Sequence, residues 1–342
     1  IASRQLCSIK VIHGQQEFAF NTCLPLCRDD LYVDRMYTSE TVSIFLPYKS
    51  IELNQRNAIF YGLNDTTKNM ILYDRTSGPN YNGLIFGFSG SGKSFTAKLE
   101  MISVLLNHPD SQLFVIDPQG EYSDFCDAFG GSHIELQTGG QFFLNPLDLD
   151  LTSDKESGND PIATKSDFVM SMLDFMATGH PINPAARSIV DRCVRRIYRP
   201  YIEAISQRTD GVTCDPSICP TLSDLYSELK LQNNELADEV NAYLESYAIG
   251  SFKTFARRTN VKTDSKFVVY DMKKLSSGMR PLGLHICIND VWNRMMENSR
   301  YNIYTWFYID EFHLLLSTES SAKFMKQIWK MARKWKGVPT GI

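Results

Sequence analysis

The residues with the clearest chemical meaning read GFSGSGKS, from Gly87 to Ser94, and they fit the pattern G-x-x-x-x-G-K-[S/T] at every position. Glycines let successive backbone N–H groups curl around a phosphate without clashes from Cβ atoms. The Lys93 ammonium can reach the β- and γ-phosphates of a nucleotide, and the Ser94 hydroxyl can hold Mg²⁺. An apolar run precedes the motif and a helical pattern follows it, a context that a chance glycine-rich turn would lack. We therefore predict a nucleotide site that contains Gly87, Ser89, Gly90, Ser91, Gly92, Lys93, Ser94 and Phe95.

A second set of candidate residues is the acidic pair Asp310 and Glu311, which directly follows the apolar run YTWFYI. Burying a carboxylate is costly unless it is paired or binds a metal. Beside a phosphate-binding loop, an acid at the end of a neighbouring strand typically completes the Mg²⁺ shell. We predict that Asp310 has this role and that Glu311 orients and polarises the attacking water. The alternative is a salt-bridged strand end without catalytic meaning.

Three further polar residues have weaker signals. In VIDPQGEY, Asp117 ends a predicted strand and Glu121 begins the next helix, so both could approach a nucleotide at the carboxyl end of a parallel sheet. An Asp-Pro turn and a helix-start glutamate favoured by the helix dipole explain them equally well, and both interpretations stay open. For His313, a hydrogen-bonded surface residue is favoured over a relay that senses the γ-phosphate.

The elements that must position these residues alternate between strand and helix. Apolar runs at 83–87 and 113–117 predict strands, and the patterns at 95–108 and 121–129 predict helices. Two later strands, at 266–271 and 304–310, flank a helix over 282–298. Strand–helix–strand units of these lengths predict an α/β fold with a mainly parallel sheet.

The remaining segments suggest additions to this α/β domain. Short alternating runs at 8–13, 41–48, 57–63 and 70–75 predict a small β-rich N-terminal portion. Between 151 and 262 strand signals nearly vanish, and a capping box (Thr221 and Asp224) predicts a helix start. We predict a β-rich lead-in over 1–80, a main domain formed by 81–150 and 263–342, and an inserted all-α lobe over 151–262.

Composition excludes several classes of protein. A chain of 342 residues exceeds the usual size of one hydrophobic core, and a net charge of −4 argues against a broadly basic nucleic-acid coat. The eight cysteines are scattered without zinc-site spacing, so we expect reduced thiols in a reducing cytosol. No run approaches the ~20 apolar residues of a membrane-spanning helix. The chain starts without Met, and VPTGI ends inside a predicted strand, so we expect it to be a piece of a longer protein.

Four blocks in this order resemble a known family. NYNGLIFGFSGSGKSF, FVIDPQGEY, FFLNPLD and WFYIDEFHLLL with AKFMKQIWKMARKWKGVPTGI are similar to blocks of the conjugal-transfer ATPase of type IV secretion systems. That family is the VirB-four type, within the FtsK/HerA-like superfamily of DNA pumps. The resemblance covers residues from about 40 to 342.

The resemblance implies a RecA-like P-loop domain with Walker A and Walker B motifs, a helical insertion, and ATP and Mg²⁺ as ligands. It also implies a homo-oligomer that can form a hexameric ring, with other secretion components as partners and DNA or protein as cargo. The location implied is the inner face of the bacterial cytoplasmic membrane. Such rings place an arginine against the neighbouring subunit's γ-phosphate, and Arg333 in KMARKWKG matches that block. A solvated face of an amphipathic helix is the alternative, and Arg257 and Arg258 are weaker candidates.

Two interpretations compete with a secretion ATPase. One is a HerA-like DNA translocase, and the other is a nucleotide-binding scaffold with little turnover. A metabolite kinase is disfavoured because the insertion shows no small-substrate pocket pattern. Arginines at 192, 195, 196 and 199 share one helix face, where a salt-bridged surface is favoured over docking of DNA or an acidic partner.

Overall fold

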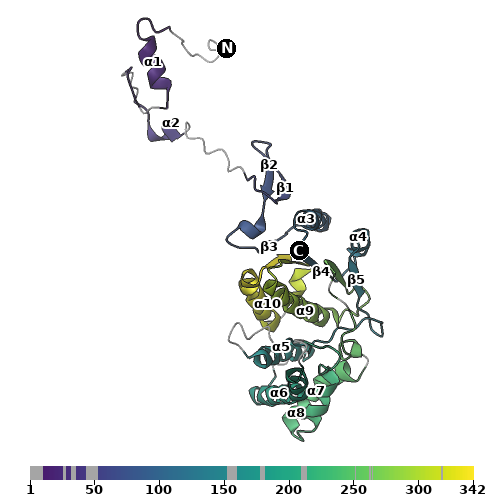
Figure 1. Cartoon of the computed structure of the whole chain (residues 1–342). Helices are drawn as coiled ribbons and strands as arrows, with labels where there is room; N and C mark the ends of the chain where they lie inside the picture. Colours follow the sequence, from purple (N-terminus) through teal and green to yellow (C-terminus); the bar gives the residue numbers. More distant parts are fainter. Residues whose placement is uncertain are drawn as a thin grey trace. The chain divides into compact units, whose positions relative to one another are not determined.

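The computed structural model describes residues 11–25, 28–31, 36–43, 53–151, 160–177, 182–208, 214–250, 252–261, 263, 265–316 and 319–342. The chain divides into two compact units, Ile1–Ile51 and Glu52–Ile342 (Figure 1). Each unit is described by itself.

The first unit contains helices where strands were predicted. Its elements are α1 (Gln16–Cys23) and α2 (Ser39–Ser43). The strand predictions for 8–13 and 41–48 are wrong over 11–13, which are irregular, and over 41–43, which end α2; the rest of both runs lies outside the described residues. The Thr38 hydroxyl explains the second error, because it accepts the N–H of Thr41 (3.3 Å) and so starts a helix.

The second unit is built on a six-stranded parallel sheet with the order β3-β8-β7-β4-β6-β5. The strands are β3 (Gly83–Leu84), β4 (Gln112–Asp117), β5 (Ser132–Glu135), β6 (Phe267–Asp271), β7 (Thr305–Ile309) and β8 (Gly337–Gly341). The central strands are buried along their whole length because helices cover both faces, which explains their continuous apolar runs. This arrangement confirms the predicted α/β fold, which is that of a RecA-like P-loop domain.

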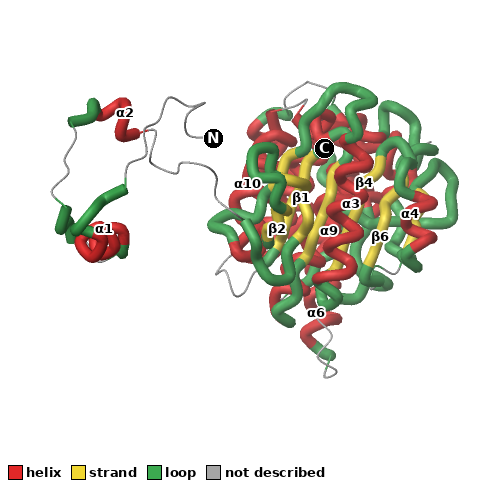
Figure 2. Tube along the Cα trace, turned by 90° about the horizontal axis from the view of Figure 1, so that it is seen from above, coloured by secondary structure: helices red, strands yellow, loops and turns green. Residues whose placement is uncertain are grey.

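Helices cover the two faces of this sheet in separate layers (Figures 1 and 2). On one face, α3 (Lys93–Asn107) and α4 (Ser123–Ala128) pack in a core with Val115, Val269 and Tyr308. On the other face, α9 (Arg280–Arg300) and α10 (Glu319–Met331) pack against Phe114, Ile116 and other side chains of the alternate register. Successive residues of a strand thus pack into the cores on opposite faces of the sheet.

The segment between β5 and β6 is helical, as predicted. It contains α5 (Pro161–Met176), α6 (Pro184–Ser206), α7 (Leu222–Lys230) and α8 (Glu235–Ala248). The predicted capping box begins α7, where the Asp224 carboxylate accepts the backbone N–H of Thr221 at 2.7 Å. These helices share one apolar core with α9, α10 and the adjacent sheet face.

A buried ion pair joins the hairpin of β1 (Ile59–Leu63) and β2 (Met70–Tyr73) to the parallel sheet. Arg75, which follows β2, donates to Glu100 on α3 (2.8 Å) and to the Thr340 hydroxyl on β8 (2.7 Å). The Tyr61 hydroxyl on β1 donates to the same carboxylate at 2.7 Å. Arg75 and Glu100 are each only 6% exposed, so hydrogen bonds within the protein must replace those that both groups would make to water.

Candidate nucleotide site

The predicted phosphate-binding loop connects β3 to α3 and is exposed to solvent. Gly90 (φ +78°) and Gly92 (φ +91°) adopt the left-handed conformation, which other residues rarely adopt without strain. Gly92 is the N-cap of α3, so the first-turn N–H groups of that helix face the loop. Lys93 folds back over the loop, with its Nζ 3.0 Å from the Gly87 carbonyl oxygen.

Helix α3 is fixed in place by its buried side, where Ala97, Met101 and Val104 pack against the sheet. The loop therefore lies at the carboxyl end of the sheet with the positive end of a helix dipole behind it. Its glycines, a free helix N-terminus and a lysine form the surroundings that phosphate groups prefer in proteins.

Asp310 lies directly beyond the end of β7, and its backbone N–H continues the ladder to Ile116 on β4 (3.1 Å). Its side chain is 8% exposed. Burial, followed by the negative charges of Asp117, Glu311 and Glu121, raises the pKa of Asp310 to about 6. Among the described residues it receives one hydrogen bond, from the N–H of Glu311 (3.0 Å).

Tyr122 links this acid to the loop, and sequence reasoning did not identify it. It is fully buried, and its pKa is raised first by burial and then by the charges of Asp310, Asp117 and Glu121. Its hydroxyl lies near Ser94, which lowers that pKa slightly, but it makes no hydrogen bond to a side chain in the described part of the chain. Ser94 and Asp310 therefore both lie close enough to Tyr122 to affect its pKa, in opposite directions.

These residues fit a magnesium ion. A hydroxyl and a carboxylate are the oxygen ligands that Mg²⁺ prefers. The buried Asp310 carboxylate has few hydrogen-bond donors and several acidic neighbours, so a cation beside it would relieve a real electrostatic cost.

Glu311 adopts the left-handed backbone conformation (φ +52°), and its side chain is 30% exposed. The side-chain amide of Gln119 donates to Oε1, and Nδ1 of His313 lies 3.1 Å from Oε2. His313 is 72% exposed and is a hydrogen-bonded surface residue, the interpretation that its sequence context favoured. After Tyr122, Gln119 is the second residue of this site that the sequence analysis did not identify, although it lies in the stretch VIDPQGEY.

Asp117 and Glu121 differ in their surroundings. Asp117 is fully buried, and its carboxylate accepts the backbone N–H groups of Gln119 (3.1 Å), Gly120 (2.7 Å) and Tyr122 (2.9 Å). This geometry is that of a turn-forming aspartate. Glu121 is exposed, and the negative charge on its side chain contributes to the raised pKa values of Asp310 and Tyr122.

Arg333 lies at the amino end of the parallel strands, whereas the loop lies at their carboxyl end. It belongs to the short helix η6 (Ala332–Trp335), which precedes β8, and it donates to the carbonyl oxygen of Pro79 and lies over the Tyr81 ring. The five residues of β8 span about 16 Å between the amino end and the carboxyl end of the sheet. Arg333 therefore cannot serve the loop of its own chain without a large rearrangement.

Most of the other predicted basic residues make intramolecular contacts. Arg195 pairs with Asp160 (2.9 Å), Arg196 with Glu228 (3.1 Å) and Arg199 with Glu203 (3.9 Å), so the arginine face of α6 is salt-bridged. Arg257 lies over the Phe143 ring at 4.6 Å. In the described ranges, no cluster of His, Cys, Asp and Glu could hold a metal by itself, and the six described cysteines are free thiols.

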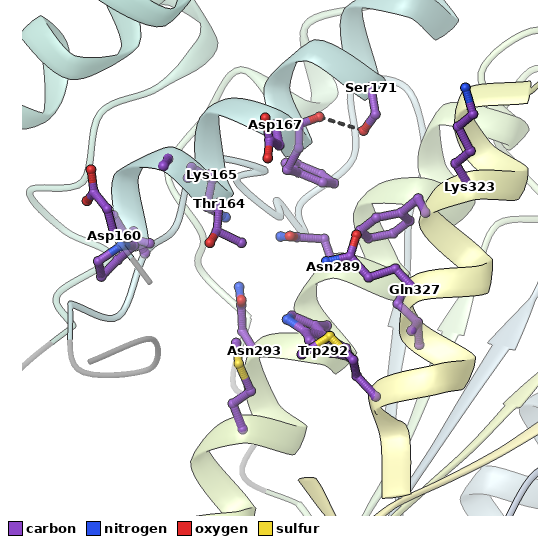
Figure 3. A pocket seen from close by; sticks show the side chains of 18 residues that line it. Asp160, Thr164, Lys165, Asp167, Ser171, Asn289, Trp292, Asn293, Lys323 and Gln327 are labelled. Atoms are coloured by element: carbon purple, nitrogen blue, oxygen red, sulfur yellow. Dashed lines mark hydrogen bonds between the residues drawn. The ribbon is translucent and has the colours of Figure 1, made fainter. Parts of the chain in front are cut away.

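A cavity of about 450 Å³ lies elsewhere, between α5, α9 and α10 (Figure 3). Thr164, Asn289, Trp292 and Asn293 are among the side chains that line it. None of the residues predicted to bind the nucleotide lines this cavity, so the phosphate loop and the cavity are separate features.

Comparisons with known proteins identify the fold and the family of this chain. The solved structure of VirB4 of Thermoanaerobacter pseudethanolicus has the same fold, with a TM-score of 0.71 and 23% identity over 86% of this chain and 78% of that chain. A search of curated proteins finds no significant match. The family model described as "Helicase HerA, central domain" (DUF87) matches residues 83–278, more than half of the sequence. The chain belongs to the HerA helicase central-domain family.

Proposed function

We propose that the chain is an ATP-hydrolysing motor that powers a conjugative type IV secretion system, by assembling its channel or by moving DNA or protein through it. The HerA family consists of P-loop ATPases, and the similarity to VirB4 supports the finer assignment. The catalytic part is supported by the placement of the Gly87–Ser94 loop beyond the carboxyl end of β3, and of Asp310 and Glu311 beyond that of β7, because both strands pair with β8 in parallel.

Each residue has a defined task in this proposal. The loop N–H groups and Lys93 bind the phosphates, and Ser94 and Asp310 hold Mg²⁺, which offsets the charge that develops on the phosphate oxygens. Glu311 orients the attacking water because its carboxylate accepts a hydrogen bond from the water O–H. Asp117 holds the turn that carries Gln119 and Tyr122.

The assembly is also part of the proposal. We propose a ring of identical subunits, hexameric in the simplest case, in which Arg333 of one subunit reaches the nucleotide of the next. The chain would work with other secretion components at the cytoplasmic face of the membrane. In the ranges that the structure describes, no helix has the length and apolar character needed to cross a bilayer.

The test is the substitution Lys93→Ala in the full-length protein. We expect ATP turnover to fall to background and affinity for Mg·ATP to drop, because the lysine charge at the phosphates is lost. Lys326→Ala, an exposed lysine on α10, is the matched control and should keep wild-type turnover. Wild-type turnover in Lys93→Ala would contradict the site assignment.

A DNA translocase is the second candidate function, favoured by the HerA family match itself. Strong stimulation of ATPase activity by double-stranded DNA would favour the translocase. ATP binding without measurable turnover in the intact protein would instead favour a nucleotide-binding scaffold.

A further inference from the structure

Two side chains engage the carboxylate of Glu311 in this structure, one on each oxygen. Gln119 donates to Oε1 and His313 lies against Oε2. They come from different elements: Gln119 follows β4, and His313 lies in the short helix η5 (Phe312–Leu316) after β7. These strands are neighbours, with Ile116 opposite Ile309, so the loops that leave them meet.

The contact from Gln119 is built on a rigid turn. The buried Asp117 carboxylate accepts the backbone N–H groups of Gln119, Gly120 and Tyr122, at 2.7 to 3.1 Å. Gly120 closes it at φ +73°, where a Cβ atom would also meet the Lys273 side chain. Gln119 is therefore presented to Glu311 from a fixed backbone, whereas His313 is mostly exposed and is free to exchange its contact for water.

Glu311 needs such support. Its side chain is partly exposed, and a glutamate at that position has several rotamers available, each of which places the carboxylate differently. A water-activating base must be held in one geometry to be effective. An uncharged amide donor fixes the carboxylate while leaving its negative charge intact, which a lysine or arginine partner would offset.

We propose that Gln119 is a positioning residue for ATP hydrolysis, which holds the Glu311 carboxylate in the orientation that activates water. This inference rests on the proposed role of Glu311. Asp117 acts indirectly, by holding the turn that presents Gln119. His313 makes only a minor contact with Glu311, which water can replace.

The test compares Gln119→Ala and Gln119→Met in the full-length protein by steady-state ATP turnover and equilibrium nucleotide binding. We expect kcat to fall about 10- to 100-fold in both variants, with nucleotide affinity unchanged. Gln119→Met keeps the length and the apolar stem, so an equal loss in both variants assigns the effect to the lost amide donor. Gln232→Ala, a hydrogen-bonded glutamine beyond the end of α7, is the control and should keep wild-type kcat.

A double-mutant comparison separates positioning from a general structural effect. In a Glu311→Gln background, Gln119→Ala should cause no further loss, because the group that it positions is already disabled. An unchanged or increased kcat in Gln119→Ala, or an equal loss in both backgrounds, would overturn the proposal. Full turnover in Glu311→Gln alone would instead overturn the proposed function on which it rests.

Discussion

At the residue scale, the phosphate-binding residues were predictable because their pattern is local. Eight consecutive positions carry the loop, and the acidic pair follows an apolar strand that stands out in the sequence. Tyr122 and Gln119 were not predictable, because their roles depend on a turn whose shape is set by the buried carboxylate of Asp117. No spacing rule connects Gln119 to Glu311, which lies in a different loop.

His285 on α9 provides a residue-scale prediction for stability against pH. Its ring is fully buried, stacks on Phe168 and lies 2.7 Å from the Ser171 hydroxyl. Burial lowers its pKa to about 3, so the unfolded chain binds a proton between about pH 6.5 and pH 3 that the folded chain does not. The folded state therefore loses stability as the pH falls through this range.

The substitution His285→Phe should remove that loss while keeping the aromatic packing. Between pH 8 and pH 5 the wild type should lose about 2 kcal/mol more unfolding free energy than the variant, at ~1.4 kcal/mol per pH unit below 6.5. Urea unfolding at both pH values measures this, with the exposed His313→Ala as control. Parallel pH dependence of wild type and His285→Phe would contradict it.

At the element scale, long apolar strands and helices were predicted well, and short or polar elements were not. β5 was missed because His133 and Glu135 give it little apolar character. β3 is shorter than the strand predicted over 83–87, because its pairing with β8 ends at Leu84, opposite Gly341. The boundaries proposed at about residues 80, 150 and 262 stay predictions. The Arg75 network nevertheless joins the hairpin to α3 and β8 within one compact unit.

The hydrogen bonds of Arg75 to Glu100 and Thr340 predict how strongly the β1–β2 hairpin is attached to α3 and β8. Arg75→Ala leaves the Glu100 carboxylate buried without its charge partner, so the free energy of unfolding should fall by about 3–5 kcal/mol. Asp65→Ala, which removes an exposed pair with Lys68 in the same hairpin, should change it by less than about 1 kcal/mol. Denaturant titration of both variants measures the difference, and equal small effects would refute the anchoring role of Arg75.

At the scale of the whole molecule, the α/β fold was predictable because alternating strands and helices admit few topologies. Arg333 lies at the opposite end of the strands from the phosphate loop, so it can act on a nucleotide only in an assembly. A residue separated from its own site by the length of a strand can still contact the nucleotide of a neighbouring subunit.

Mixing two inactive variants tests this arrangement. Lys93→Ala subunits keep Arg333, and Arg333→Ala subunits keep the phosphate loop, so a mixed ring should contain some complete sites. Random assembly should restore about a quarter of the wild-type rate per site if the sites act independently. Lys334→Ala, an exposed neighbour, should keep full activity alone. No recovery on mixing would contradict action between subunits.

The central claim is that Glu311 activates water for hydrolysis at a nucleotide site built by the Gly87–Ser94 loop. The most direct measurement is ATP turnover, together with Mg·ATP affinity, of Glu311→Gln in the full-length protein. Turnover should fall by at least about 10²-fold with affinity close to wild type, because the base is lost while the phosphate contacts remain. Turnover within a few-fold of wild type would contradict it.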